Sequence, residues 1–202
     1  MKTTRTPQQK RSIEKRTKIL EAAFILFSEK GFENTNTAEI SQHAGVATGT
    51  LYSYFQDKVD IYKTVFESYL KKEVSKMLSE LECEINNHTN ISQFILLWKD
   101  SYLSLFGKPN RALKEINSVM SKVQSLNIFF SDFETEYVES IYKILKEKYN
   151  PEITFEKVWI AFLLIDELSK EYVSSRHKKI NYNLLEKQAI VFIETLLTND
   201  GG

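Results

Sequence analysis

The residues that could do chemistry gather in one short stretch, residues 48–58, in which hydroxyl groups are dense and charge is almost absent. The stretch contains five hydroxyl-bearing side chains and a cation at its end: Thr48, Thr50, Tyr52, Ser53, Tyr54 and Lys58. Gly49 lies among them and carries no side chain, so the backbone of another molecule can approach it closely. Hydroxyls and cations bind phosphate oxygens, and hydroxyls also contact base edges. The stretch therefore indicates a surface that binds DNA.

Two short helices joined at a glycine turn are predicted to position this surface. Asn36 and Glu39 have the spacing of a capping box, so a helix should begin just after Asn36. That helix should stop at Gly45, because glycine accepts the positive φ of a sharp turn. Leu51 and Phe55 stand four residues apart and should face inward from a second helix. This arrangement is a helix-turn-helix.

At residues 31–58 the sequence reads GFENTNTAEISQHAGVATGTLYSYFQDK and resembles the DNA-binding region of the TetR family of bacterial regulators. The family pattern is G-F/Y-x-x-T, followed by I-A-x-x-A-G-V-S-x-G-T-L-Y-x-Y-F-x-x-K. The likeness extends over roughly residues 13–65. Ser41 replaces the usual alanine, which is a small-for-small change. Ala47 replaces a frequent serine and removes a hydroxyl that would cap the recognition helix, so Thr48 is expected to cap it or to contact phosphate.

The resemblance implies a division of labour among these residues. It assigns contacts with the phosphate backbone of DNA to Asn36, Thr37, Tyr52 and Lys58. Contacts in the major groove fall on Thr48, Gly49, Thr50 and Ser53, and Tyr54 is a further candidate for DNA contact. Structural roles compete with these assignments: Asn36 as a cap only, Tyr54 as a core aromatic residue, and Thr50 as a space filler.

The remaining sequence predicts an all-α fold. With 202 residues, 6 Gly and 3 Pro, the chain is long enough for a core and too poor in turn residues for an all-β fold. Helical periodicity and breaks predict helices at 11–30, from Asn36 to Gly45, 48–55, from Lys58 past Leu81, and at 91–106, 110–126, 129–149, 154–177 and 182–198. We expect a basic flexible arm at 1–10, a helix-turn-helix domain at 11–57 and a helical regulatory and dimerisation domain at 58–202.

The N-terminus is locally basic although the whole chain has a formal net charge of zero. Seven cations face a single anion, Glu14, within the first twenty residues: Lys2, Arg5, Lys10, Arg11, Lys15, Arg16 and Lys18. Local charge of this kind either attracts DNA phosphates or belongs to a solvated arm.

An aromatic ridge in the expected body suggests a ligand cavity. Its members recur every four residues: Phe94, Trp98, Tyr102 and Phe106. Asp166 follows an apolar run and would suit a cationic ligand beside aromatic rings. A packed core and a solvated or salt-bridged carboxylate are the competing interpretations. A small apolar or amphipathic inducer is the expected occupant.

The last two long helices are the expected dimer interface. Residues 158–165 are apolar around the whole helix, so more than one side must be covered. With the amphipathic final helix they form the candidate interface, for which we single out Trp159, Phe162, Ile165, Phe192 and Leu196. The resemblance implies a four-helix interface here, and a purely intrachain core is the alternative.

Other function classes find little support in the sequence. The single Cys83 excludes an intramolecular disulfide, and the three isolated histidines provide no metal site. No nucleophile motif, phosphate loop, metal group or cofactor motif suggests an enzyme. No apolar run reaches the roughly twenty residues of a membrane span, and no secretory signal opens the chain, which favours the cytoplasm. Together with the resemblance, the sequence leads us to expect a homodimeric repressor that reads a palindromic DNA operator and is released by a ligand. The alternative is a helical protein-interaction adaptor.

Overall fold

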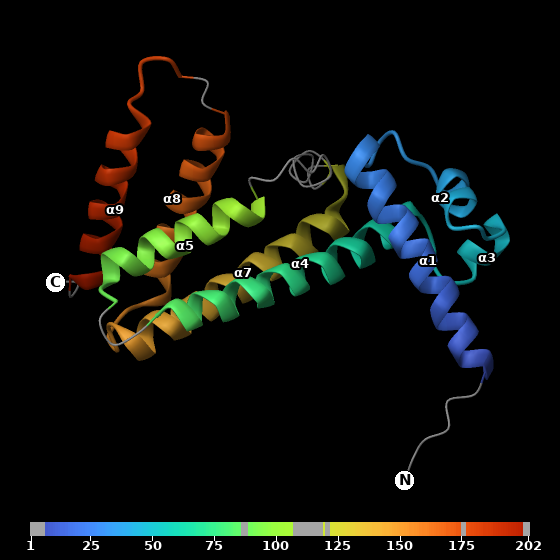
Figure 1. Cartoon of the computed structure of the whole chain (residues 1–202), viewed down its shortest axis with the longest axis horizontal. Helices are drawn as coiled ribbons and strands as arrows, with labels where there is room; N and C mark the ends of the chain where they lie inside the picture. The colour runs from blue at the N-terminus through green and yellow to red at the C-terminus, as the bar shows by residue number, and fades with distance from the viewer. Residues whose placement is uncertain (1–6, 86–88, 107–118, 120–121, 175–176, 200–202) are drawn as a thin grey trace, which may run out of the picture. The chain divides into compact units, whose positions relative to one another are not determined.

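The computed structural model describes residues 7–85, 89–106, 119, 122–174 and 177–199, and this part of the chain is helical without strands. The expected all-α class is confirmed. The helices, shown in Figure 1, are α1 (Pro7–Lys30), α2 (Thr37–His43), α3 (Thr48–Tyr52), α4 (Lys58–Glu84), α5 (Ile91–Phe106), α7 (Gln124–Lys148), α8 (Phe155–Ser174) and α9 (Tyr182–Thr198). No helix in the described ranges is long and apolar enough to cross a membrane.

Helix bounds depart from the sequence prediction at several places. α1 begins four residues earlier than the expected residue 11, and α3 ends at Tyr52 rather than at residue 55. The break expected near Asn127 is wrong, because α7 runs through it without interruption. Asparagine inside a helix costs only a few tenths of a kcal/mol more than a good helix former, too little to stop a helix that buries apolar residues. Most of the helix expected at 110–126 lies outside the described residues.

Two compact units make up the chain: Met1–Lys71 with Pro109–Phe130, and Lys72–Lys108 with Ser131–Gly202. The division falls inside α4, whereas we expected a boundary just before Lys58. The difference arises because the first half of α4 supplies core residues to the N-terminal helices, among them Tyr62 and Phe66. α4 therefore contributes residues to both units.

An aromatic cluster holds the first unit together. The ring of Tyr62 lies 5.1 Å from that of Phe27, 5.0 Å from that of Phe32 and 4.5 Å from that of Phe66. Tilted and edge-on ring pairs at these distances are favourable beyond the area that they bury. These ring contacts join α1, its following loop and the first half of α4.

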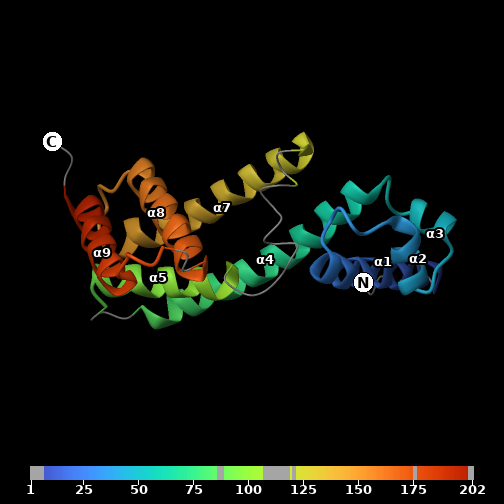
Figure 2. The same ribbon diagram turned by 90° about the horizontal axis from the view of Figure 1, so that it is seen from above.

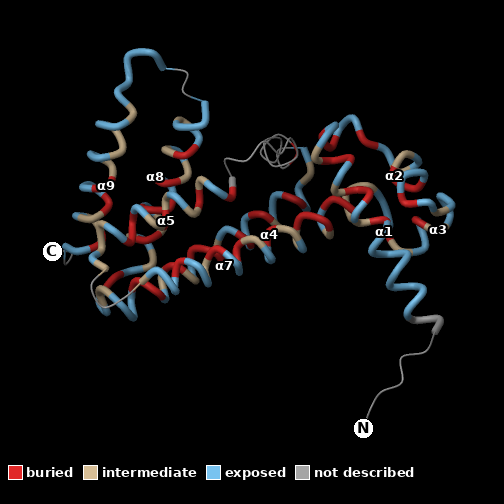
Figure 3. Tube along the Cα trace, viewed as in Figure 1, coloured by how far each residue is buried: buried red, intermediate tan, exposed pale blue. Residues whose placement is uncertain are grey.

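In the second unit, α8 packs against α9, and α5 packs against both of them. Figures 1 and 2 show α8 and α9 as neighbouring helices joined by the segment before Tyr182. Figure 3 shows their buried positions on one side of each helix. The core of this unit includes large side chains that are fully enclosed, such as Trp98 and Phe94.

Candidate functional site

The start of α2 is held by the capping box that the sequence predicts. The Asn36 side chain accepts a hydrogen bond from the backbone N–H of Glu39 at 2.9 Å, and the Glu39 carboxylate accepts one from the Asn36 N–H at 3.4 Å. A hydrogen bond from Lys30 lowers the pKa of Glu39, so its carboxylate stays charged. Asn36 thus has a structural role as a cap, while its side chain remains exposed at the edge of α2.

The turn between α2 and α3 depends on one glycine. Gly45 has a φ of 65°, in the region that residues with a Cβ rarely adopt, as the sequence analysis expected. The N–H of Val46 then donates to the carbonyl of Ser41 at 3.0 Å and closes the turn. Ser41 is buried, but its hydroxyl donates to the Thr37 carbonyl at 2.7 Å. The serine that departs from the family pattern is therefore tolerated because its polar group is satisfied.

α3 presents polar groups outward because its apolar residues face inward. Leu51 is fully buried and Phe55 nearly so, as predicted. The residues on the opposite face are exposed: Thr48, Gly49, Tyr52 and Ser53. Ala47 occupies the N-cap position and makes no side-chain cap. A Cβ built on Gly49 would meet nothing within 4 Å, which places this residue at an open surface of the unit.

A pair of hydroxyl groups joins α2 to α3 on this exposed face. The Thr37 Oγ1 and Tyr52 Oη atoms are 2.9 Å apart, and Tyr52 remains 51% exposed. Each hydroxyl keeps capacity for a further hydrogen bond, because a hydroxyl has one donor and two acceptor positions. The structure thus brings together two residues to which the resemblance assigns phosphate contacts.

Other predicted contact residues are less free. The Ser53 hydroxyl donates to the Thr50 carbonyl at 2.6 Å, so only its lone pairs face outward. Thr50 and Tyr54 are half-buried. Of the nine predicted residues, Thr48, Tyr52 and the backbone at Gly49 are therefore the best placed for a partner.

Lys58 points into the protein rather than away from it. Its Nζ atom donates to the Phe32 carbonyl at 2.8 Å and lies 4.2 Å from the centroid of the Phe32 ring. Burial lowers the pKa of Lys58, and the nearby charge of Glu33 opposes this shift. Sequence reasoning missed this contact, since Phe32 precedes Lys58 by 26 residues and no local pattern links them.

The aromatic ridge of the body is packed and its polar atoms have partners inside the protein. Phe94 and Trp98 are fully buried and Tyr102 is 6% exposed. The Trp98 indole N–H donates to the Tyr137 hydroxyl at 2.7 Å. The side chain of Phe106 lies outside the described part of the structure.

Asp166 is tied to the ridge and to a lysine. It accepts a hydrogen bond from the Tyr102 hydroxyl at 2.8 Å and from Lys170 at 2.5 Å. Burial, together with the charge of Asp166, raises the pKa of Tyr102 well above its usual range. Of the two interpretations of Asp166, a ligand-binding carboxylate or a salt-bridged one, this conformation agrees with the salt bridge.

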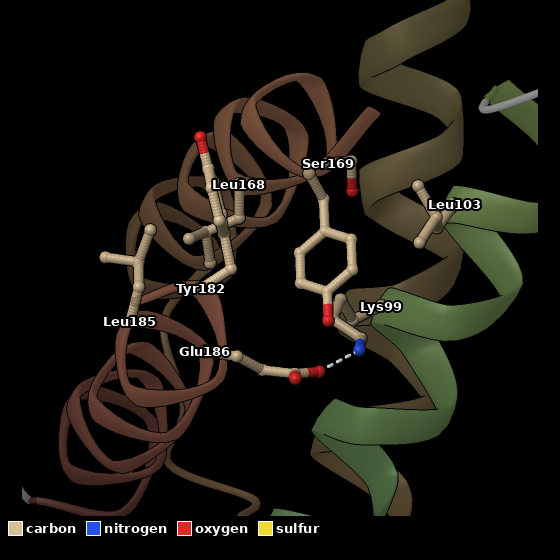
Figure 4. A pocket seen from close by; sticks show the side chains of 8 residues that line it. Lys99, Leu103, Leu168, Ser169, Tyr182, Leu185 and Glu186 are labelled. Carbon is tan, nitrogen blue, oxygen red and sulfur yellow. Dashed lines mark hydrogen bonds and ion pairs between the residues drawn. The ribbon is translucent and has the colours of Figure 1, made fainter. Parts of the chain in front are cut away.

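A small cleft opens elsewhere in the second unit, among α5, α8 and α9 (Figure 4). The space in it that a water molecule can occupy is only about 10 Å³. An ion pair between Lys99 and Glu186 lies at one end of it, and Asp100 also contacts Lys99 at 2.8 Å. The other lining residues are Leu103, Leu168, Ser169, Tyr172, Tyr182 and Leu185. No sequence pattern had linked these residues to a pocket.

Several apolar residues of α8 and α9 are exposed, and they differ in part from the predicted interface residues. Phe162 and Ile165 are 4% and 0% exposed, so these two assignments are corrected: both residues belong to the core of the unit. Trp159 and Leu196 are half-buried, and Phe192 is 57% exposed as an interface residue should be. The exposed apolar residues of the two helices are Ile160, Leu163, Tyr172, Val173, Leu184, Val191 and Phe192.

Comparison with known proteins finds a family model that matches the N-terminal part of the chain. Residues 19–65 match the family model described as bacterial regulatory proteins, tetR family. A fatty acid metabolism regulator protein of Bacillus subtilis is 30% identical over 96 residues, which are 47% of this chain and 47% of that protein. The chain thus spans 47% of the length of this relative and 31% of the length of another, the regulator HbdR of Aromatoleum.

Solved structures resemble nearly the whole chain. A putative fatty acid metabolism regulator of Clostridium perfringens has a TM-score of 0.58 at 26% identity, over 92% of this chain and 99% of that one. FadR of Bacillus subtilis, solved in complex with stearoyl-CoA, has a TM-score of 0.63 at 20% identity over the same shares of the two chains. The second likeness, at this identity, concerns the fold alone.

Proposed function

Because residues 19–65 match the model of the TetR family of bacterial regulators, we propose that the chain is a transcriptional regulator that binds duplex DNA. The observation that carries the proposal is the exposed hydroxyl face of α3, held by the Gly45 turn and by the Asn36 capping box. Such a face can enter a major groove and contact base edges, while the Thr37–Tyr52 hydroxyl pair binds phosphate oxygens. A protein-interaction adaptor would not need this face.

The regulator is proposed to act as a homodimer in the cytoplasm. The exposed apolar residues of α8 and α9 supply a surface that a second copy can cover, with Leu163, Val191 and Phe192 at 49%, 61% and 57% exposure. Self-association through one surface on each copy produces two-fold symmetry. A dimer with two-fold symmetry should read a palindromic operator.

We also propose that the protein represses transcription and that a small amphipathic molecule bound in the second unit releases it from DNA. The stearoyl-CoA complex of a protein with the same fold supports an amphipathic ligand. The cleft next to Lys99 is one entry point, and the ridge at Trp98 and Tyr102 is another if it repacks. A ligand can lower DNA affinity only by binding the released conformation more tightly than the DNA-bound one.

Binding titrations test the DNA proposal on the full-length protein. A duplex selected from a random-sequence pool serves as the operator, and a scrambled duplex serves as the comparison. Thr50→Ala should relax base preference at one position of each half-site, at a cost on the order of 1 kcal/mol, with little change in salt dependence. Tyr52→Phe should weaken binding to both duplexes about equally, because phosphate contacts carry no sequence information.

The same titrations, run on Lys58→Ala, test whether Lys58 contacts a phosphate. As a phosphate contact, Lys58 should contribute about one unit to the salt slope for both duplexes. Its inward position shows that the side chain would have to leave the Phe32 carbonyl to do so. Thr135→Ala, at a half-buried position in α7, is the matched control and should change neither affinity nor salt slope. Failure of the wild-type protein to select any duplex would overturn the proposed function.

A further inference from the structure

The first half of α1 contributes no buried side chain to its unit among residues 10–18. The helix begins at Pro7, but Ile19 is its first buried residue. Residues 10–18 are exposed without exception, as Figure 3 shows along the free end of α1. Ile13, the one large apolar residue among them, is 48% exposed. These turns of helix therefore form a solvent-facing extension of the DNA-binding module, called the α1 extension below.

The α1 extension is strongly basic. Its charged residues are Lys10, Arg11, Lys15, Arg16 and Lys18, with Glu14 as the only anion among residues 10–18. Arg11, Lys15 and Lys18 follow at intervals of four and three residues, so they form a row along one side of the helix. A row of three cations spaced along a rod matches the regularly spaced charges of a nucleic-acid backbone.

This charge pattern is unfavourable for the helix itself. Cations near a helix N-terminus oppose the helix dipole, by about 0.3–1 kcal/mol each. Arg11 and Lys15 are also like charges at i, i+4, which repel each other. Most helical stability in proteins comes from an apolar face packed on other elements, and this segment has none. An external polyanion would turn the same charges into a source of stability.

The α1 extension is continuous with the proposed DNA-binding surface. The Arg16 guanidinium lies 5.3 Å from the centroid of the Phe55 ring, three residues beyond the end of α3. This contact connects the extension to the helix-turn-helix within the same unit. Charge complementarity and continuity with the α3 surface together favour duplex DNA as the partner.

We propose that the α1 extension binds the phosphates of duplex DNA next to the half-site that α3 reads. The inference rests on the proposed DNA-binding function and adds a second contact surface to it. Since the side chains involved are cations, the contact strengthens binding to all sequences and does not select bases. It makes the affinity of the protein more sensitive to salt than the helix-turn-helix alone would.

The test compares the full-length wild-type protein with the triple variant Arg11→Gln, Lys15→Gln, Lys18→Gln. Glutamine has nearly the helix propensity of lysine and arginine, so circular dichroism should show unchanged helix content. Fluorescence anisotropy with the selected duplex and with its scrambled counterpart, from 50 to 200 mM salt, gives the affinity and the salt slope. The triple variant should bind both duplexes at least about tenfold more weakly at the lowest salt, and its slope should fall by roughly two to three per subunit.

Two further variants make the result specific. Glu14→Gln removes the single anion and should strengthen binding to both duplexes, which a merely structural role of the helix would not produce. The control Lys143→Gln, Lys178→Gln, Lys179→Gln removes three exposed cations of the second unit and should leave the salt slope unchanged. The wild-type protein should not bind phosphatidylglycerol vesicles more tightly than the triple variant does.

The outcomes separate this inference from the proposed function. If the wild-type protein selects a duplex and the triple variant keeps its affinity and salt slope, the α1 extension does not bind DNA and the inference is overturned alone. A preference of the extension for vesicles, without an effect on DNA, overturns it equally. If the wild-type protein binds no duplex, both the inference and the proposed function fail.

Discussion

The DNA-binding module and the helical body use the same kind of side chain in opposite ways. Tyr52 on α3 is 51% exposed, and its hydroxyl contacts another surface hydroxyl, that of Thr37. Tyr102 on α5 is 6% exposed, and its hydroxyl donates to Asp166 inside the body. The comparison teaches that a hydroxyl group serves recognition where it keeps unused hydrogen-bonding capacity at a surface. In the body it serves packing, because a buried polar group needs a partner.

The largest expected effect is a loss of stability on substitution in the core of α8, which we compare with a substitution on the exposed surface of α9. Phe162→Asp places a carboxylate at a 4% exposed site among aromatic rings and removes a buried side chain. It should lower the free energy of unfolding by about 3–5 kcal/mol. Phe192→Asp changes a residue that is 57% exposed and should leave the fold intact while separating the dimer. Chemical denaturation and light scattering measure the two effects.

Equal loss of stability in both variants would contradict this separation of core and surface. Glu194→Gln, at a half-buried polar position of α9, is the control and should affect neither stability nor association. A wild-type protein that stays monomeric at micromolar concentration would remove the exposed surface of α8 and α9 as a dimer interface.

A smaller effect is expected at alkaline pH and concerns the body alone. Burial and the charge of Asp166 raise the pKa of Tyr102 above its value of about 10 in an unfolded chain. The resulting stability is fully present below pH 10 and is lost as the pH rises, because the unfolded chain then releases a proton that the folded protein keeps. One pH unit above 10 should cost about 1.4 kcal/mol for this residue.

Tyr102→Phe should therefore flatten the alkaline decline in the free energy of unfolding, measured by urea denaturation between pH 9 and 11. Tyr52→Phe, at the surface of α3, is the matched control and should leave the decline as steep as in the wild-type protein. An unchanged profile in Tyr102→Phe would mean that this hydroxyl is accessible to water in solution.

The smallest expected effect on stability lies in the module. Asn36→Ala removes the side-chain acceptor of the capping box and should cost about 1 kcal/mol, because the N–H of Glu39 loses its partner. Asn36→Asp keeps an acceptor and should retain most of the stability. Thermal unfolding measures both variants. An alanine variant as stable as the aspartate variant would show that the cap does not stabilise α2.

Features of the module that depend on neighbouring residues were predictable from the sequence. The capping box needs only the three-residue spacing of Asn36 and Glu39, and the turn needs only a residue that tolerates the φ of 65° found at Gly45. The inward position of Leu51 follows from helical periodicity, and so does the exposure of Tyr52 beside it. The conformation of the helix-turn-helix and its polar face were therefore foreseen.

Contacts between residues distant in sequence were decided by the tertiary structure. The Trp98 indole meets the Tyr137 hydroxyl 39 residues away, and Lys58 meets a carbonyl 26 residues before it. In α8 the apolar residues surround the helix, so periodicity could not tell that Phe162 faces the core while Leu163 faces outward. Apart from the break wrongly expected near Asn127, the sequence by itself determined which of the described segments are helical and where the capped turn lies, because hydrogen bonds and steric limits between near neighbours control both. Which side of each helix is buried depends on the helices packed against it, and only the folded chain brings those together.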